Sequence, residues 1–155
     1  MISTLTMENP VFVAYAIAAA LMVLKIMAQG WATVALMLRA DAGLLNPEDL
    51  RRTPANRNPR PEQLDPQPDV ERSRRMHRND LESIPAFLAC GILFVISEPP
   101  FWLATLLFAL FVLARLAHTF AYATAQNHEV RATFYSIGSV IVVVMAVWVL
   151  IVALV

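Results

Sequence analysis

The sequence is poor in cysteine, in lysine and in charge. Cys90 is the only cysteine of 155 residues and lies in an apolar run, which excludes an intrachain disulfide and favours a packed apolar role. Only 15% of the residues are charged, against roughly 25% in soluble domains, whereas 58% are hydrophobic. The formal net charge is zero, which gives no support for a nucleic-acid partner. These shortages indicate a protein embedded in a membrane.

The usual signatures of several kinds of chemistry are also missing. No spacing of His, Cys and Asp is typical of a metal site, so we expect no metal ion. No glycine-rich loop suits a phosphate, and no nucleophile and base form a visible triad. The site must therefore be sought among charged residues inside the apolar segments.

Long apolar runs dominate the chain and predict an all-α integral membrane fold. A helix needs about 20 residues to cross the hydrocarbon core of a bilayer. Four segments meet or approach that length, and we expect helices at about 11–38, 70–97, 101–125 and 130–155. The expected architecture is a four-helix transmembrane bundle that forms one domain, residues 1–155.

The segment 39–69 separates the first two predicted helices and sets the expected topology. It holds six of the ten prolines and shows no periodicity, so we expect an irregular loop. Together with the start of the next helix it carries nine of the twelve basic residues, which predicts a cytoplasmic location for this loop and places both termini on the opposite side. The excess of arginine over lysine favours a bacterial inner membrane over the endoplasmic reticulum.

Polar residues share one face of the second predicted helix. They stand at positions i, i+3, i+4 and i+7 and are Arg75, Arg78, Asn79 and Glu82. Ionisable residues within a membrane span are rare and by default mark a functional site or a buried pair.

The third and fourth predicted helices carry matching polar faces. Arg115, His118 and Tyr122 share a face, and Arg115 lies about 15 Å from the loop-side end of its helix, too deep to reach water easily. It needs an acidic partner, and we expect Glu82 because it lies at a comparable depth. Arg131 stands four residues before Tyr135 at the start of the fourth helix.

The convergence of these three faces predicts a ligand site at the cytoplasmic end of the bundle. So much polarity is costly in a membrane unless a ligand satisfies it. Guanidinium groups bind carboxylates, and Glu82 or Asp80 could receive an ammonium group. The residues therefore suit a small zwitterion with excess negative charge.

Several stretches resemble the MAPEG superfamily, the membrane-associated proteins of eicosanoid and glutathione metabolism. The stretches are Asn46-Pro47-Glu48-Asp49, Asp69-Val70-Glu71-Arg72, Arg75-x-His77-Arg78-Asn79-Asp80-Leu81-Glu82 and Arg115-x-x-His118-Thr119-x-x-Tyr122. They are most similar to the branch with microsomal glutathione transferase and microsomal prostaglandin E synthase. The resemblance implies a homotrimer in the lipid bilayer that binds glutathione as co-substrate between neighbouring subunits, near the cytoplasmic face.

The resemblance also implies roles for particular residues. Those that match the family's glutathione-binding positions are Arg75, Arg78, Asn79, Glu82, His118, Tyr122, Arg131 and Tyr135. Arg131 matches the arginine that faces the thiol, where a cation favours the thiolate. Arg39 is a further expected ligand, although Met37 occupies the family's register. Accessory roles are expected for Asp49, Arg115 and His77.

The expected function is a membrane-bound glutathione transferase acting on lipophilic electrophiles, with lipid hydroperoxide reduction as an accompanying activity. The alternatives are a prostaglandin E synthase-type isomerase, a non-catalytic lipid-binding scaffold and a proton-coupled transporter. Ala132 and Asn127 differ from the synthase pattern and favour the transferase. The residues that match glutathione ligands disfavour the scaffold, and the lack of an inverted repeat disfavours the transporter.

Overall fold

Four long helices make up most of the computed structural model, which describes residues 4–155, so the first three residues of the predicted domain lie outside it. They are α1 (Pro10–Ala40), α2 (Pro68–Ile96), α3 (Phe101–Ala123) and α4 (His128–Leu154). Each is long and apolar enough to cross a bilayer. The expected all-α fold with four spanning helices is therefore confirmed, and the chain is a multi-pass membrane protein.

The polar residues that flank the apolar runs define where the helices begin. The side chains of Asn9, Gln67 and Asn127 each accept a hydrogen bond from a backbone N–H in the first turn of α1, α2 and α4, respectively. At the other end of α2, Pro99 and Pro100 cannot continue a helix and turn the chain into α3. Capping therefore defines where α1, α2 and α4 begin.

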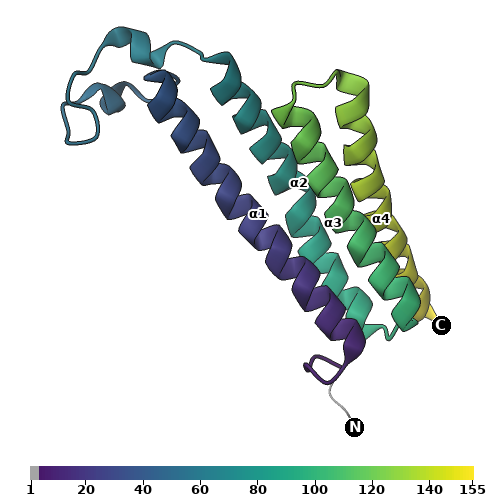
Figure 1. The fold of residues 1–155 in the computed structure, drawn as a ribbon. Helices are drawn as coiled ribbons and strands as arrows, with labels where there is room; N and C mark the ends of the chain where they lie inside the picture. Colours follow the sequence, from purple (N-terminus) through teal and green to yellow (C-terminus); the bar gives the residue numbers. More distant parts are fainter. Residues whose placement is uncertain (1–3) are drawn as a thin grey trace.

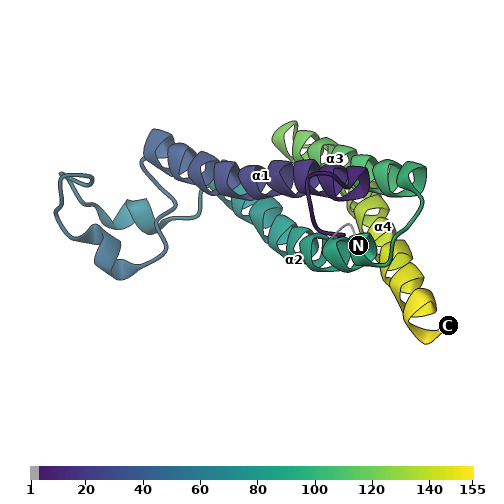
Figure 2. The same cartoon turned by 90° about the horizontal axis from the view of Figure 1, so that it is seen from below.

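Helices α2 and α3 lie in the middle of the bundle, with α1 and α4 on opposite sides (Figures 1 and 2). Helix α1 packs on α2 and α3, and so does α4, but α1 and α4 do not meet within residues 4–155. The 41–67 segment and the α3–α4 turn lie at one end of the bundle, hereafter the loop end, and the C-terminus lies at the other end with the start of α1 (Figure 1).

The 41–67 segment contains more local structure than the expected irregular loop. Two short 3₁₀ helices, η1 (Pro47–Leu50) and η2 (Pro61–Leu64), begin at prolines, whose fixed φ suits a first helical position. The buried Gln63 of η2 ties this segment to the end of α1: its amide donates to Asp41 at 2.6 Å, and its carbonyl oxygen accepts from Asn56 at 2.8 Å. Short turns of this kind carry no periodicity, so the sequence pattern could not reveal them.

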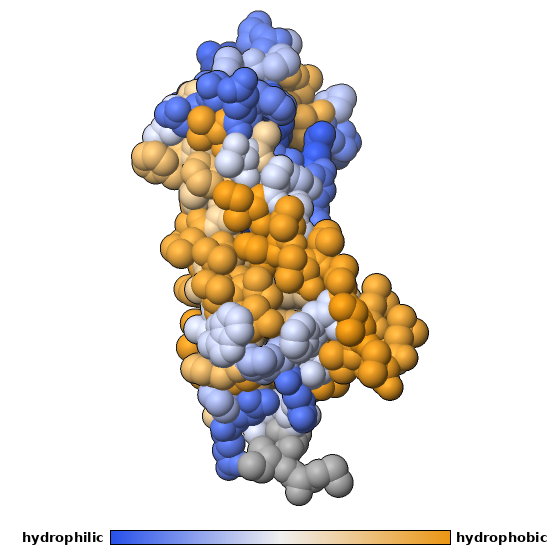
Figure 3. All heavy atoms as spheres, turned by 90° about the vertical axis from the view of Figure 1, so that its right-hand side faces the viewer, coloured by the Kyte–Doolittle hydropathy of each residue, from blue (hydrophilic) through white to orange (hydrophobic). Residues whose placement is uncertain are grey.

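Aromatic rings fill the half of the bundle away from the loop end. The rings of Phe87 and Phe111 stack with centroids 4.0 Å apart, and Phe108 meets Phe87 edge to face at 5.9 Å. Gly91 makes room for Tyr15, because a Cβ atom at Gly91 would lie 2.6 Å from the tyrosine ring. The outer surface is apolar as well: Figure 3 shows a broad hydrophobic band between more hydrophilic ends.

Candidate functional site

Helix α2 presents three polar residues at the loop end of the bundle. Pro68 and the Gln67 cap fix the start of the helix, so Arg75, Asn79 and Glu82 project from one side, toward α3 and α4. Residues three and four apart stack along a helix, which explains why the sequence pattern placed these three together. The side chain of Arg75 is exposed, whereas Asn79 is half-buried.

The turn between α3 and α4 positions Arg131. Asn127 caps α4 with its side chain, and its backbone carbonyl accepts a hydrogen bond from Nε of Arg131 at 3.2 Å. The guanidinium carbon of Arg131 lies 4.8 Å from the centre of the Tyr122 ring. The arginine is thereby held in the first turn of α4, where the helix dipole also favours an anion.

These side chains surround a pocket of about 470 Å³ between α2, α3 and α4. Its lining residues are Arg75, Asn79, Glu82, His118, Tyr122, His128, Arg131, Ala132, Tyr135 and Ser136. Seven of the residues expected to bind glutathione are therefore brought together around one cavity.

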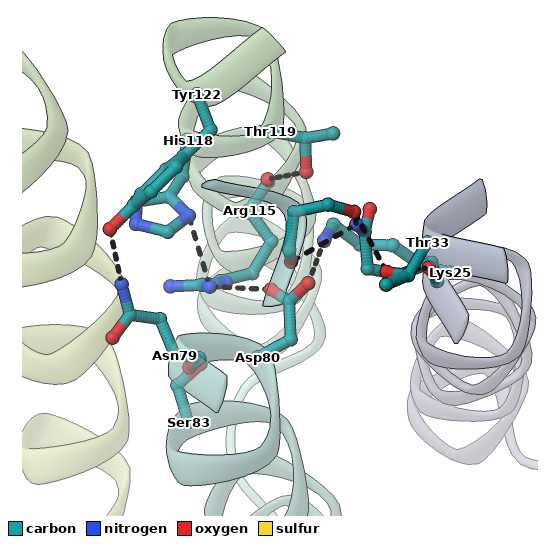
Figure 4. A network of polar contacts seen from close by, with 11 residues as sticks. Lys25, Thr33, Asn79, Asp80, Ser83, Arg115, His118, Thr119 and Tyr122 are labelled. Carbon is teal, nitrogen blue, oxygen red and sulfur yellow. Dashed lines mark hydrogen bonds and ion pairs between the residues drawn. The ribbon is translucent and has the colours of Figure 1, made fainter. Parts of the chain in front are cut away.

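Hydrogen bonds and ring contacts shape the α3 wall of the pocket (Figure 4). The amide of Asn79 donates to the hydroxyl of Tyr122 at 2.9 Å. The His118 ring lies between Tyr122 and Tyr135, with centroid separations of 4.9 and 6.2 Å. The wall thus joins α2 to α3 and leaves polar atoms facing the cavity.

A buried group of charges lies directly behind this wall. Asp80 is fully buried and accepts from Nζ of Lys25 and from Nη2 of Arg115, each at 2.5 Å. The same Nη2 lies 3.2 Å from Nδ1 of His118 (Figure 4). Two cations and one anion therefore meet between α1, α2 and α3, next to the pocket.

The prediction that Glu82 pairs with Arg115 was wrong. The structure pairs Arg115 with Asp80, and Glu82 lies exposed on the pocket side of α2. Depth alone suggested Glu82, but two residues along a helix correspond to a rotation of about 200°. Asp80 is fully buried and absent from the pocket lining, whereas Glu82 belongs to that lining.

Besides the buried Arg115, four of the expected residues lie outside the pocket lining. Arg78 is exposed on α2, and Arg39 is exposed in the last turn of α1. Asp49 accepts from the backbone of Asn46 in η1, which closes a local capping box. His77 is half-buried on α2, and its Nδ1 has no hydrogen-bond partner within residues 4–155.

Sequence reasoning missed two residues of this region. Lys25 joins the charged group from α1, and the signal was its position as the one lysine inside an apolar span. A cation at such a depth requires an acid. His128 lines the pocket from the first residue of α4, where only the exact start of the helix would have revealed it.

The charges of the pocket favour an organic anion that also carries a cation. Arg75 and Arg131 present guanidinium groups, and Glu82 presents the one carboxylate of the lining. Within residues 4–155, no group of three or more His, Cys, Asp or Glu side chains could hold a metal ion. The arrangement suits a small organic ligand that carries anionic groups together with an ammonium group.

Comparison with known proteins defines the family. Residues 6–151 match the MAPEG family. The chain belongs to the MAPEG family. The chain is 39% identical over 132 residues to microsomal glutathione S-transferase 1 of Bos taurus, a match that covers 85% of this chain and 84% of that protein. It is 33% identical over 135 residues to prostaglandin E synthase of Homo sapiens, with coverage of 87% and 85%.

Membership of the MAPEG family confirms the resemblance and leaves the reaction open between the two kinds of relative. Human microsomal glutathione S-transferase 1 is 38% identical over 135 residues, 87% of this chain and 86% of that protein. Ala132 and Asn127, which bear on this choice, have clear positions in this MAPEG protein: Ala132 lines the pocket and Asn127 caps α4. The Asn127 carbonyl accepts from Arg131, and Ala132 follows Arg131 directly in the chain.

Proposed function

We propose that this protein binds glutathione in the pocket at the loop end and joins it through its thiol sulfur to lipophilic electrophiles. The observation that carries the proposal is the charge pattern of the lining. Glutathione has two carboxylates, one ammonium group and a thiol. Arg75 would bind a carboxylate, Glu82 would bind the ammonium group, and Asn79, His118, Tyr122 and Tyr135 would bind the peptide backbone.

Arg131 is the residue to which we assign stabilisation of the thiolate. A nearby cation and a helix N-terminus both lower the pKa of a thiol, which is about 8.5 when free. Arg131 sits in the first turn of α4 and is held by Asn127. The thiolate would attack the electrophilic carbon and form a C–S bond. In a chloroarene the C–Cl bond then breaks, chloride leaves, and the thiol proton passes to water.

An apolar groove gives the electrophile a route from the bilayer. This groove of about 720 Å³ runs along α4, with Leu110 of α3 and Val140 of α4 among its apolar lining. It shares His128, Ala132 and Ser136 with the polar pocket. An apolar substrate concentrated in lipid would therefore reach the thiolate without crossing water, and holding both reactants together supplies part of the acceleration.

We further propose that the protein works as a homotrimer with the loop end in the cytoplasm. The support is the family resemblance together with the position of Arg39 and Arg78, which are exposed and could reach the ligand of a neighbouring subunit. The basic loop favours the cytoplasmic side by the positive-inside rule. Light scattering of the detergent-solubilised protein measures the oligomeric state, and a labelling reagent that cannot cross membranes measures the orientation.

The decisive experiment follows thiolate formation by ultraviolet stopped-flow absorbance when glutathione is mixed with the purified protein. Wild-type protein should form thiolate and conjugate a chlorodinitrobenzene. Arg131→Ala should lose the thiolate signal and about 10²-fold in kcat. Arg72→Ala is the matched control, because Arg72 lies outside the pocket and pairs with Asp69 at 3.0 Å. An Arg131→Ala variant that forms thiolate at the wild-type level would contradict the assignment.

The same preparation separates the remaining functions. Isomerisation of a prostaglandin endoperoxide is the second candidate, favoured by the likeness to human prostaglandin E synthase. Turnover of the endoperoxide without conjugation would favour the isomerase. Assay with an organic hydroperoxide tests the accompanying peroxidase activity. Absence of glutathione binding would favour a scaffold or a transporter.

A further inference from the structure

A continuous chain of contacts connects Asp80 to the wall of the pocket (Figure 4). Asp80 holds the guanidinium group of Arg115 at 2.5 Å, and Arg115 contacts Nδ1 of His118 at 3.2 Å. Asp80, Arg115 and His118 are all buried. The His118 ring extends past this contact to the pocket, where Tyr122 and Tyr135 flank it.

The identity of the donor in the contact between Arg115 and His118 follows from chemistry. An arginine side chain remains protonated in proteins and has no acceptor atom, so the N–H of Arg115 must donate. Nδ1 of His118 must therefore carry a lone pair. A neutral imidazole with an unprotonated Nδ1 carries its proton on Nε2.

The position of Arg115 is fixed from several directions, so this contact is well defined. Asp80 is bridged to Lys25 on α1 and cannot turn away without breaking a second buried ion pair. The guanidinium carbon lies 5.8 Å from the centre of the Tyr135 ring. A Cβ atom at Gly138 would lie 3.6 Å from Cδ of Arg115, so the glycine leaves α4 close against the arginine.

We infer that Asp80 acts through Arg115 as a positioning residue that fixes His118 as an Nε2–H donor facing the pocket. Nε2 makes no hydrogen bond within residues 4–155, so its proton is free for a carbonyl or carboxylate oxygen of a bound peptide. The inference rests on the proposed function for the identity of that peptide. It also excludes His118 as the base that removes the thiol proton, because its lone pair faces Arg115.

Nitrogen-15 NMR of the imidazole rings tests the tautomer directly in wild-type protein. The chain has three histidines, so loss of one ring signal in His118→Gln assigns the His118 resonances. The expected result in protein without glutathione is an unprotonated Nδ1 and a protonated Nε2. In Arg115→Met the preference should weaken or reverse. A wild-type His118 with its proton on Nδ1, or on both nitrogens, would overturn the inference.

Two amide substitutions test the use of the donor. Glutamine can place an N–H near the position of Nε2, whereas asparagine reaches only as far as Nδ1. Titration calorimetry should show that His118→Gln keeps about tenfold more glutathione affinity than His118→Asn. The reverse order would overturn the donor role.

The same measurements distinguish this inference from the proposed function. Wild-type protein that shows the predicted tautomer but gives no heat with glutathione would refute the proposed function and leave the tautomer intact. Wild-type protein that binds glutathione with its proton on Nδ1 of His118 would refute the inference alone.

Discussion

The two halves of the helix bundle are built from different interactions. Away from the loop end, rings such as Phe87, Phe108 and Phe111 interlock across α2 and α3. Toward the loop end, the same two helices are joined by the buried ion pair of Asp80 and Arg115. The aromatic half depends on close packing, whereas the loop end also depends on ion pairing.

Packing alone accounts for the aromatic half but not for the charges at the loop end. In a bilayer, helices associate by close packing and by hydrogen bonds, since lipid is as apolar as their side chains. An unpaired charge at the centre of a spanning helix costs about 2.5–3.5 kcal/mol on insertion scales. The buried Asp80 and Arg115, together with the half-buried Lys25, are charges that packing alone does not require.

Removing Asp80 should produce the largest loss of stability. Asp80→Ala leaves Lys25 and Arg115 buried without their anion, and breaking a buried pair in this way costs about 3–5 kcal/mol. Unfolding by denaturing detergent measures the difference. The control is Asp69→Ala, whose carboxylate pairs with Arg72 at the surface and should contribute less than about 1 kcal/mol. Equal losses for the two variants would contradict the comparison between the halves.

The positions of the helices and the shared face of the α2 site residues could be predicted from the sequence. The lengths of the apolar runs and the flanking prolines gave the four helices, because crossing a bilayer requires a fixed length. The spacing of Arg75, Asn79 and Glu82 gave a shared face, because a helix repeats every 3.6 residues. These features depend only on local geometry.

Tertiary pairing could not be predicted in the same way. Both Asp80 and Glu82 lie at a suitable depth for Arg115, and only the packing of α2 against α3 decides which one faces it. The contact of Lys25 with Asp80 joins two residues that are 55 positions apart in the sequence. Arg78 shares the spacing of the pocket residues but lies outside the lining. Helical periodicity gives the face of a residue but not its neighbours.

A change at Gly91 should weaken the aromatic half and spare the pocket. Gly91→Ala places a methyl group 2.6 Å from the Tyr15 ring, and overpacking of this kind costs about 1–3 kcal/mol. The matched control is Gly30→Ala in α1, where nothing lies within 4 Å and helix propensity favours alanine by about 1 kcal/mol. Glutathione titration of the folded Gly91→Ala protein should match wild type. A marked loss of binding would show that the two halves are coupled.

The smallest change in stability should come from removing an ion pair that is exposed to water. Comparing it with a pair inside the bundle separates the effect of charge from the effect of burial. Arg60 pairs with Asp41 in the 41–67 segment, and both side chains are 58% exposed. Arg60→Gln should lower stability by less than about 1 kcal/mol, and salt should erase the difference because it screens exposed charges over about 10 Å at 0.1 M. Lys25→Met removes a buried partner of the same Asp80 that Arg115 still holds, so its effect should not change with salt. If salt reduced the effects of both substitutions equally, water and ions would have to reach Asp80. That result would contradict the claim that burial shields its ion pairs behind the pocket.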